Sequence, residues 1–267
     1  MTKSAAFFDL DRTLISGASA LPVGVEAWRQ GLAGNREIAT WVTSAITFMI
    51  LGDKGESSDE TKTAFLSRIV DAPVEALDSL GSAVLPRLVS QVRPESKSLI
   101  KMHREAGRET WIVSASPSVV VEPLAASLGM TGGLGTRGLV VDGRYTGELD
   151  GPFMYGAGKA EAIEKLASER GYDLERCYAY SDSVSDLPMM ELVGHPVAVN
   201  PDSALNDIAH KRGWPVVIFA RKTKRAIAWS SLAAGAAAVA IGSYALGRRH
   251  GRSSTLIEAA SRSLRRT

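Results

Sequence analysis

The chain has 267 residues, of which 45% are hydrophobic and 22% are charged, and its formal net charge at pH 7 is +2. This length is sufficient for one sizeable hydrophobic core and a second, smaller module. Such a small net charge is no nucleic-acid footprint, so we expect no nucleic-acid partner. Cys177 is the only cysteine, which excludes an internal disulfide and favours a reducing compartment.

The first predicted element is a buried strand that ends in acidic residues. Residues 5–10 form a short apolar run with the length of a buried parallel strand. Asp9 and Asp11 stand at its end, and ligands of open α/β sheets bind beyond such strand ends. The two carboxylates are therefore placed to hold a cation such as Mg²⁺, and Asp9 is placed to act as a nucleophile. An Asp-rich turn without a chemical role is the alternative.

Residues 17–92 are expected to be mostly helical and to form a cap inserted after the first strand. Within this insert, residues 36–51 are apolar on nearly every side, which is typical of a buried helix; contact with a lipid or an apolar substrate is the alternative. Two further helices are predicted, one from Asp59 to the residue before Pro73 and one from Pro73 through Leu85. Such an insert would lie as a lid over the strand ends.

The next predicted unit is a helix, a strand and a second helix, at residues 95–106, 110–113 and 118–128. Ser114 and Ser116 lie at the junction between the strand and the second helix. A hydroxyl there is suited to an anion, because a helix N-terminus presents free N–H groups. A simple helix cap is the alternative for Ser114.

A hairpin and a lysine-bearing helix come next. Residues 138–149 alternate on either side of Asp142-Gly143, which is a hairpin signal. Gly156-Ala-Gly158-Lys159 then begins a helix that is predicted to run to about Glu169. A lysine in the first helical turn opposes the helix dipole, so a phosphate partner would account for Lys159; a solvated surface lysine is the alternative.

The last predicted elements are three strands and a helix, at residues 176–180, 196–199, 215–219 and 203–212. Asp182 and Asp186 follow the first of these strands, where acidic residues can also serve only the dipole of the next helix. His195 and His210 have no metal-ligand spacing, and we interpret both as structural.

This order of elements predicts an α/β fold with a doubly wound parallel sheet. In that fold the strand-to-helix junctions lie on one edge of the sheet. The residues expected to converge there are Asp9, Asp11, Ser114, Lys159, Asp182 and Asp186. Several carboxylates near one point remain ionised only with a cation between them, which Mg²⁺ would provide. The hydroxyl and the amine beside them would then hold a phosphoryl group.

In this arrangement the chain resembles phosphatases of the haloacid dehalogenase (HAD) superfamily, subfamily IB, which includes phosphoserine phosphatase. The residues that carry the resemblance, in motif order, are Asp9-Leu-Asp11-Arg-Thr13, Ser114 in Val-Ser-Ala-Ser, Lys159 in Gly-Lys, and Ser181-Asp182 with Asp186. The resemblance covers residues 5–220. It implies a HAD-like, Rossmannoid catalytic core at residues 1–16 and 93–220, with the helical cap at residues 17–92.

The resemblance also implies a role for each of these residues. Asp9 would form an aspartyl-phosphate, while Asp11 would donate a proton to the leaving oxygen and then accept one from water. Ser114 and Lys159 would hold the phosphoryl oxygens. The implied Mg²⁺ ligands are Asp9, Asp182 and the backbone carbonyl of Asp11. Asp186 would support either the waters of the metal or Lys159, and Thr13 is a further supporting residue.

Two positions depart from the phosphoserine phosphatases. Those enzymes carry a glutamate nine residues after the nucleophile, which recognises the amino group of the substrate, and here this position is Ala18. Ser185 stands where an asparagine is usual in the fourth motif. The loss of a charged partner for an ammonium group costs about 2–5 kcal/mol of recognition. The departures therefore leave the substrate open, although not the reaction class.

Residues 221–267 are predicted to form a C-terminal apolar helix and a basic tail. Residues 226–246 are uncharged and alanine-rich, and they have the length of about 20 residues that crosses a bilayer. A buried helix at a homodimer interface is the alternative, and basic residues at both ends leave the orientation open. The apolar run after Lys3 is too short for a secretory signal. We therefore expect a cytoplasmic catalytic domain that the C-terminal helix anchors to the cell membrane.

The sequence thus predicts a Mg²⁺-dependent phosphomonoester hydrolase that acts on a small phosphorylated substrate, with phosphoserine as the first expectation. A phosphorylated lipid precursor, such as lysophosphatidate or phosphatidylglycerol phosphate, is the alternative that the apolar segments favour. A membrane-tethered binding module without catalysis is a hypothesis from a different class.

Overall fold

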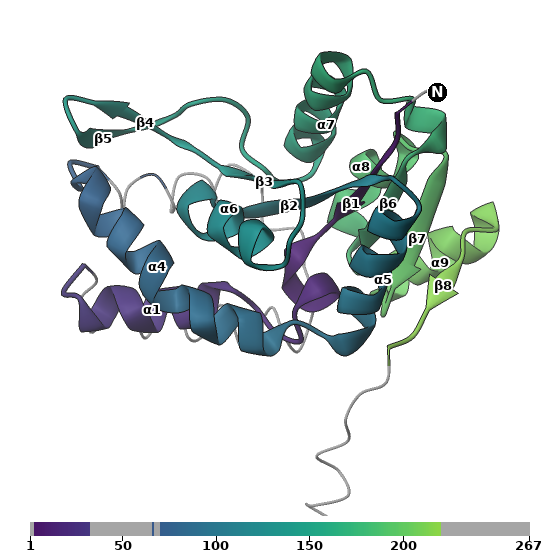
Figure 1. Cartoon of the computed structure of the whole chain (residues 1–267), viewed down its shortest axis with the longest axis horizontal. Coiled ribbons are helices and arrows are strands. Elements are labelled where there is room, and N and C mark those ends of the chain that lie inside the picture. Colours follow the sequence, from purple (N-terminus) through teal and green to yellow (C-terminus); the bar gives the residue numbers. More distant parts are fainter. Residues whose placement is uncertain (1–2, 33–65, 67–69, 220–267) are drawn as a thin grey trace, which may run out of the picture. The chain divides into compact units, whose positions relative to one another are not determined.

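Strand β1 (Ala5–Phe8) is an inner strand of a six-stranded sheet (Figure 1). The structure is a computed structural model that describes residues 3–32, 66 and 70–219. The strand order is β3-β2-β1-β6-β7-β8, and every pairing in this sheet is parallel. The remaining strands are β2 (Glu109–Pro117), β3 (Gly132–Thr136), β6 (Tyr178–Ser181), β7 (His195–Val199) and β8 (Val216–Val217). The predicted doubly wound parallel α/β fold is confirmed.

The strand order reverses beside β1. The chain adds β2 and β3 on one side of β1, and then returns to add β6, β7 and β8 on the other side. Ligands of doubly wound sheets bind outside the carboxyl ends of the strands at such a switch point. The topology therefore indicates a ligand site among the residues that directly follow β1 and β6.

Both faces of the sheet are covered by helices. The α-helices are α1 (Ala20–Arg29), α4 (Val74–Gln91), α5 (Pro94–Glu105), α6 (Ser118–Ser127), α7 (Ala157–Arg170), α8 (Leu187–Glu191) and α9 (Ser203–Arg212). Side chains of α4, α5 and α6 join Ala6 and Phe8 in one core cluster, whereas those of α7, α8 and α9 join Ala5 and Phe7 in another. Because neighbouring residues of a strand point to opposite faces, the apolar run of β1 serves both cores.

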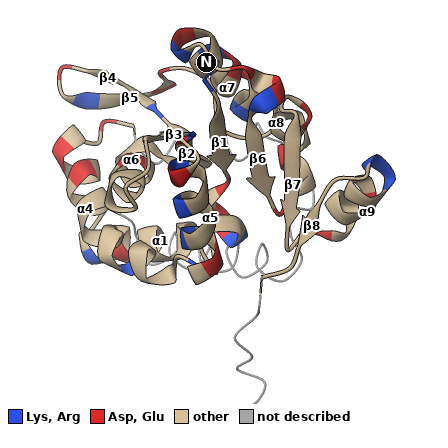
Figure 2. Cartoon of the chain, turned by 45° about the vertical axis from the view of Figure 1, so that its right-hand side comes forward, with Lys and Arg blue, Asp and Glu red and all other residues tan. Residues whose placement is uncertain are grey.

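Charged side chains are nearly absent from the four inner strands, where Glu109 at the start of β2 is the exception. Strands β1, β6 and β7 carry no charged residue, whereas α4, α5 and α7 carry many, as the colours in Figure 2 show. This distribution is expected for a parallel sheet that is buried on both faces. The charged residues that directly follow β1 and β6 are therefore exceptions that need a reason.

Strand β3 was not predicted, and β2 is longer than predicted. Strand β3 contains three glycines, a composition that favours turns over strands. A side chain on Gly132 would lie 2.4 Å from the Trp111 ring, and one on Gly135 would lie 2.7 Å from the backbone of Ser118. The strand therefore needs glycine because Trp111 and the start of α6 approach it closely.

Within the predicted cap, residues 17–92, the structure describes helices α1 and α4. Helix α4 continues past the predicted end at Leu85 to Gln91, with Pro86 inside it. It approaches α6 so closely that a side chain on Gly81 would lie 2.1 Å from the carbonyl oxygen of Val119. The helices predicted at residues 36–51 and 59–72 lie outside the described residues.

The predicted hairpin is confirmed as β4 (Gly138–Val141) and β5 (Arg144–Leu149). Its turn residues Asp142 and Gly143 have φ angles of 50° and 76°, the left-handed pair that a tight hairpin turn requires. Tyr145 of β5 also exchanges backbone hydrogen bonds with Asp71 and Ala72, which directly precede α4. The hairpin is thus held against the base of the cap helix.

Cys177, the only cysteine, has the environment of a buried structural residue. Cys177 is fully buried, its Sγ lies 3.2 Å from the backbone N–H of Ala5, and it donates to the carbonyl of Asp173 at 3.2 Å. Burial raises the pKa of this thiol. The thiol is therefore protonated in the folded protein.

The predicted membrane helix at residues 226–246, with the rest of residues 221–267, lies outside the described residues. In the part of the chain that the structure describes, no helix combines the length and the apolar character needed to cross a bilayer.

Candidate active site

The polar residues predicted to converge lie at one edge of the sheet. Asp9 and Asp182 are the first residues after β1 and β6, which are neighbouring parallel strands. The backbone N–H of Asp9 continues this pairing by donating to the carbonyl of Tyr180 at 2.9 Å. Ser114 lies two positions beyond Ile112, which is the partner of Phe8 in the sheet. The carboxyl ends of three neighbouring strands thus supply the site.

Lys159 is the central cation of this site. Its Nζ lies 2.7 Å from Oδ1 of Asp9 and 2.7 Å from Oδ1 of Asp186, and only 3% of the residue is exposed. Burial alone would lower the pKa of Lys159, but the carboxylates of Asp186 and Asp9 outweigh it and raise the pKa. The amine is therefore protonated, and it pairs residues that are far apart in the sequence.

Two glycines place Lys159 in this position. Gly156 precedes α7 with a φ of 54°, a left-handed conformation that favours glycine. A side chain on Gly158 would lie 1.9 Å from the carbonyl oxygen of Phe153. The Gly-Ala-Gly-Lys sequence thus allows the chain to fold tightly before the first turn of α7, which carries Lys159 toward β1. The alternative of a solvated surface lysine is wrong.

Asp9 lies in a concentration of negative charge. Burial raises its pKa most; Lys159 lowers it, and the carboxylates of Asp186, Asp182 and Asp11 raise it further. These interactions show that the four carboxylates are close enough to repel one another. One lysine does not offset this charge.

Asp182 has two different environments at its two oxygens. Oδ1 accepts a hydrogen bond from the Thr13 hydroxyl at 3.2 Å, while Oδ2 lies 3.0 Å from Nε of Arg12. Oδ2 is buried and accepts no hydrogen bond from the described residues. Burial raises the pKa of Asp182 to about 7 although Arg12 lowers it. The second oxygen is thus a buried acceptor that a cation would satisfy.

Arg12 reaches Asp182 from an unusual backbone conformation. It lies in the wide turn η1 (Leu10–Leu14), which Ile15 closes by donating its N–H to the carbonyl of Leu10. The φ of Arg12 is 60°, in the left-handed region that a residue other than glycine seldom adopts. This ion pair was not predictable from the sequence, because its two partners are 170 positions apart.

Asp186 is fully engaged within the site. It lies in the single turn η3 (Val184–Asp186), contacts Lys159 with both carboxylate oxygens, and accepts a hydrogen bond from the Ser181 hydroxyl at 2.7 Å. The described structure thus favours contact with Lys159 among the two supporting roles that the resemblance left open. Ser183 and Ser185 hydrogen-bond to each other in the same turn.

Asp11 is held by a residue that the sequence did not indicate. Ser19 donates its backbone N–H to Oδ1 of Asp11 at 2.6 Å and its hydroxyl to Oδ2 at 3.0 Å. The Ser19 hydroxyl also lies 2.7 Å from the hydroxyl of Ser116. The sequence analysis singled out no role for Ser19, and its contact with Asp11 became visible only in the structure.

The comparisons with known proteins agree with this geometry. The family model of haloacid dehalogenase-like hydrolases matches residues 6–191. The chain belongs to this family. All four motifs, from Asp9 to Asp186, lie within the matched residues.

Named relatives support the same reaction class. A probable phosphatase of Mycobacterium tuberculosis is 40% identical over 264 residues, which cover 92% of this chain and 90% of that protein. The phosphoserine phosphatase SerB1 of the same organism is 38% identical over 256 residues, which cover 92% of this chain and 81% of that protein. A solved protein with unknown function from Bordetella pertussis Tohama I has a TM-score of 0.70 at 28% identity, covering 81% of this chain and 99% of that one. The HAD enzyme described here is a phosphatase.

The donor set of this phosphatase fits a hard divalent cation. Asp9 and Asp182 offer carboxylate oxygens on neighbouring strands, and Oδ2 of Asp182 is a buried acceptor without a hydrogen bond. Within residues 3–32, 66 and 70–219, no three His, Cys, Asp or Glu side chains are grouped closely enough to hold a metal by themselves. A cation here would therefore need two carboxylates completed by a backbone carbonyl and water, which is a coordination that Mg²⁺ accepts.

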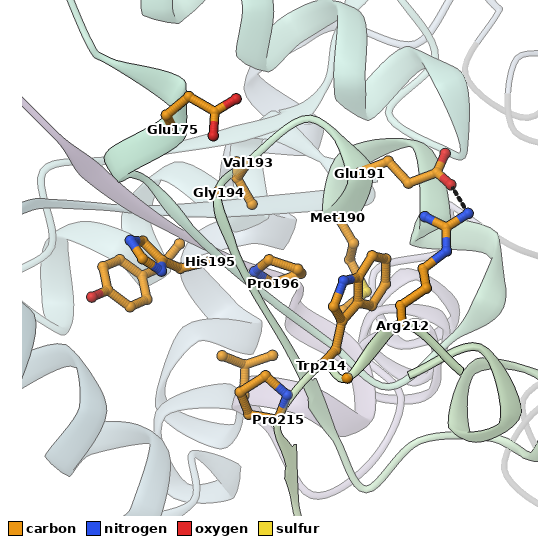
Figure 3. A pocket seen from close by; sticks show the side chains of 13 residues that line it. Glu175, Met190, Glu191, Val193, Gly194, His195, Pro196, Arg212, Trp214 and Pro215 are labelled. Carbon is orange, nitrogen blue, oxygen red and sulfur yellow. Dashed lines mark ion pairs between the residues drawn. The ribbon is translucent and has the colours of Figure 1, made fainter. Parts of the chain in front are cut away.

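A separate pocket of about 550 Å³ lies at the opposite ends of the strands (Figure 3). Its walls include Tyr178 and His195, the first residues of β6 and β7, whereas the candidate catalytic residues follow the last residues of their strands. An ion pair between Glu191 and Arg212 closes one side, with Trp214 nearby. None of the residues predicted for catalysis lines this pocket, so it is not the phosphatase site.

Proposed function

We propose that this HAD phosphatase is a Mg²⁺-dependent phosphomonoesterase that works through an aspartyl-phosphate. The observation that carries the proposal is the contact of the Lys159 amine with both Asp9 and Asp186 beside the buried carboxylate of Asp182. This arrangement leaves one carboxylate at a strand end, oriented by a cation, in a place where a dianionic phosphoryl group would find positive charge. Bound Mg²⁺ would neutralise the phosphoryl oxygens and the crowded carboxylates.

Each site residue would have a defined role in the two steps of the reaction. An Asp9 oxygen attacks phosphorus, the bond from phosphorus to the leaving oxygen breaks, and Asp11 gives a proton to that oxygen. Water then attacks the phosphorus of the aspartyl-phosphate, Asp11 accepts its proton, and the bond between phosphorus and the Asp9 oxygen breaks to release inorganic phosphate. Lys159 and Ser114 bind the phosphoryl oxygens throughout, because positioning and charge neutralisation supply most of the catalysis in phosphoryl transfer.

Phosphoserine is the first substrate to test, because a relative at 38% identity carries the name of that activity. Ala18 argues for a wider panel, since this buried alanine offers no charge to an amino group. A phosphorylated lipid precursor at the membrane is the second candidate. It is favoured by Ala18 and by the apolar segments at residues 36–51 and 226–246.

The decisive experiment replaces the proposed nucleophile. The Asp9→Asn variant keeps the shape of the side chain but removes its negative charge, so the rate of phosphate release should fall by roughly a thousandfold or more. Its far-ultraviolet circular dichroism spectrum should stay unchanged, which would show that the fold is intact. Asp207→Asn on α9 removes an exposed carboxylate and should retain full activity. Activity of Asp9→Asn near that of the control would exclude the nucleophile assignment.

A second experiment tests the intermediate and the substrate. Beryllium fluoride or vanadate should form a Mg²⁺-dependent adduct with the wild-type chain and none with Asp9→Asn. A phosphate-release screen should then compare phosphoserine with lysophospholipid phosphates, with and without detergent. Preference for the lipid esters would select the second candidate.

A further inference from the structure

We propose that Ser19, supported by Ser116, is a positioning residue that aims Asp11 at the leaving oxygen of the substrate. The inference rests on the proposed function, because it concerns the residue that protonates the leaving group. It adds to that proposal a residue at the start of the cap and a hydroxyl from β2, neither of which belongs to the acidic and lysine machinery of the site.

The contact between Ser19 and Asp11 uses both carboxylate oxygens. The backbone N–H of Ser19 donates to Oδ1 at 2.6 Å, and the hydroxyl donates to Oδ2 at 3.0 Å. Two hydrogen bonds from one residue fix the rotation of a carboxylate as well as its position. Ser19 is completely buried, so water does not compete for these bonds. Such a contact holds the Asp11 carboxyl group in one orientation.

The Ser116 hydroxyl determines the direction of this hydrogen-bond chain. The two serine hydroxyls are 2.7 Å apart, and the proton of the Ser19 hydroxyl is engaged by Asp11. Ser116 must therefore donate to Ser19 whenever Ser19 donates to Asp11. Its own backbone N–H donates to the hydroxyl of Ser114 at 3.2 Å. The end of β2 thus supports both the acid and the proposed phosphate-binding serine.

The backbone bond also identifies the oxygen of Asp11 that carries the exchangeable proton. A backbone N–H only donates, so Oδ1 of Asp11 remains an acceptor. The backbone bond favours the unprotonated state of Oδ1, so the proton that passes to the leaving oxygen is favoured on Oδ2, whose partner is a hydroxyl that can turn. During the reaction the bond between Asp9 and phosphorus forms, the bond to the leaving oxygen breaks, and that oxygen takes this proton.

A positioning role makes a specific kinetic prediction. A poor leaving group needs the proton from Asp11, whereas p-nitrophenolate leaves without one. Removing a hydroxyl that aims Asp11 should therefore slow hydrolysis of phenyl phosphate more than that of p-nitrophenyl phosphate, and the two esters have similar shapes. A merely structural role of Ser19 would slow both esters equally.

The test uses Ser19→Ala and Ser116→Ala in the full chain with Mg²⁺. The readout is kcat/KM, which reports the first step and excludes the later hydrolysis of the aspartyl-phosphate that both esters share. For Ser19→Ala, kcat/KM with phenyl phosphate should fall by about 10- to 100-fold, a part of the 100- to 10,000-fold that general acid catalysis supplies. With p-nitrophenyl phosphate, kcat/KM should change by less than about threefold. Ser116→Ala should show the same selectivity with a smaller loss. If Ser19→Ala does not fold, the comparison of the two esters is made with Ser116→Ala alone.

Ser98→Ala is the matched control, because Ser98 is an exposed residue of α5 whose hydroxyl bonds only locally to Pro94. It should leave both rates unchanged. Equal losses with the two esters, or no loss with either, would overturn the positioning role while leaving the proposed phosphatase mechanism intact. If the wild type releases phosphate neither from these two esters nor from any ester of the substrate screen, the proposed function fails and the inference fails with it.

Discussion

The amine of Lys159 combines nearly complete burial with two short carboxylate contacts. A buried charge is tolerated only when it is paired, and breaking such a pair leaves an uncompensated charge in a poorly solvated place. Lys159 therefore stabilises the folded chain and also prepares the site for an anion. The effect of Lys159 on stability can be separated from its effect on activity by neutralising first Lys159 and then also its partner Asp186.

Replacing Lys159 by Gln should destabilise the protein by roughly 3–5 kcal/mol, because Asp9 and Asp186 then repel each other without an intervening cation. Activity should also be lost. The double variant Lys159→Gln with Asp186→Asn should recover a large part of the stability and none of the activity. Urea unfolding and phosphate release measure the two properties, and additive losses of stability in the double variant would contradict the coupling.

Arg12 contacts the same carboxylate that we propose for Mg²⁺ binding, so the two cations should compete for Asp182. Arg12→Gly removes one competitor and also suits the left-handed backbone, which costs other residues about 1–2 kcal/mol. We expect Mg²⁺ to raise the melting temperature of Arg12→Gly by more than that of the wild type. Arg12→Lys, which keeps the positive charge, is the control. An equal rise in the wild type and Arg12→Gly would show that Arg12 and Mg²⁺ do not compete.

The sequence identified the chemical groups of the site better than their contacts. Asp9, Asp182 and Lys159 were recognisable because each follows a strand or begins a helix, and parallel topology brings such positions together. The pairing of Arg12 with Asp182 and of Ser19 with Asp11 was not predictable. These contacts depend on the backbone of the wide turn after β1 and on the directions of individual side chains. The hydrophobic periodicity of the sequence predicts neither.

At the scale of whole elements, His103 connects α5 to the sheet. Its Nε2 lies 2.7 Å from the Tyr180 hydroxyl of β6, and its Nδ1 accepts a hydrogen bond from Nε of Arg108 at 2.7 Å. Nδ1 therefore carries no proton, and the neutral ring donates from Nε2 to Tyr180. Burial and the nearby Arg108 lower the pKa of His103 to about 4.

This contact makes the stability of the protein depend on pH. Between pH 6.5 and pH 4 the unfolded chain binds a proton at His103 that the folded chain does not bind, so the free energy of unfolding falls as the pH is lowered. The contribution is on the order of 3 kcal/mol across this range. The His103→Gln variant should lose this part of the pH dependence. Urea unfolding at several pH values tests the expectation, and parallel curves for both proteins would refute it.

Elements with strong local signals were predicted well. The hairpin at β4 and β5 was recognisable from Asp142-Gly143, and α9 was predicted with the bounds that the structure shows. Strand β3 was missed because its glycines are required by close contacts that the local sequence does not show. These contacts are with the Trp111 ring and with the start of α6. The end of α4 was also predicted too early. Its burial against α6 stabilises the helix past Leu85 despite Pro86.

At the scale of the whole described unit, the reversal of strand order beside β1 is what assembles the site. Lys159 follows Asp9 by 150 positions and Asp182 follows Thr13 by 169, yet each pair is in contact. Doubly wound folds achieve this by returning the chain to the same sheet edge after every helix. The reactive groups thus gather at one edge of an apolar framework, and Lys159 also contributes to its stability, so substitutions at the site need a stability measurement beside the activity assay.

The isolation of Cys177 between β1 and the loop before β6 has a practical consequence. Because the chain has one thiol and folding hides it completely, a thiol reagent added to the native protein can react only after this region opens. The rate of labelling therefore reports the opening of the sheet beside the switch point. Slower labelling with Mg²⁺ or a phosphate analogue would measure ligand binding without any turnover.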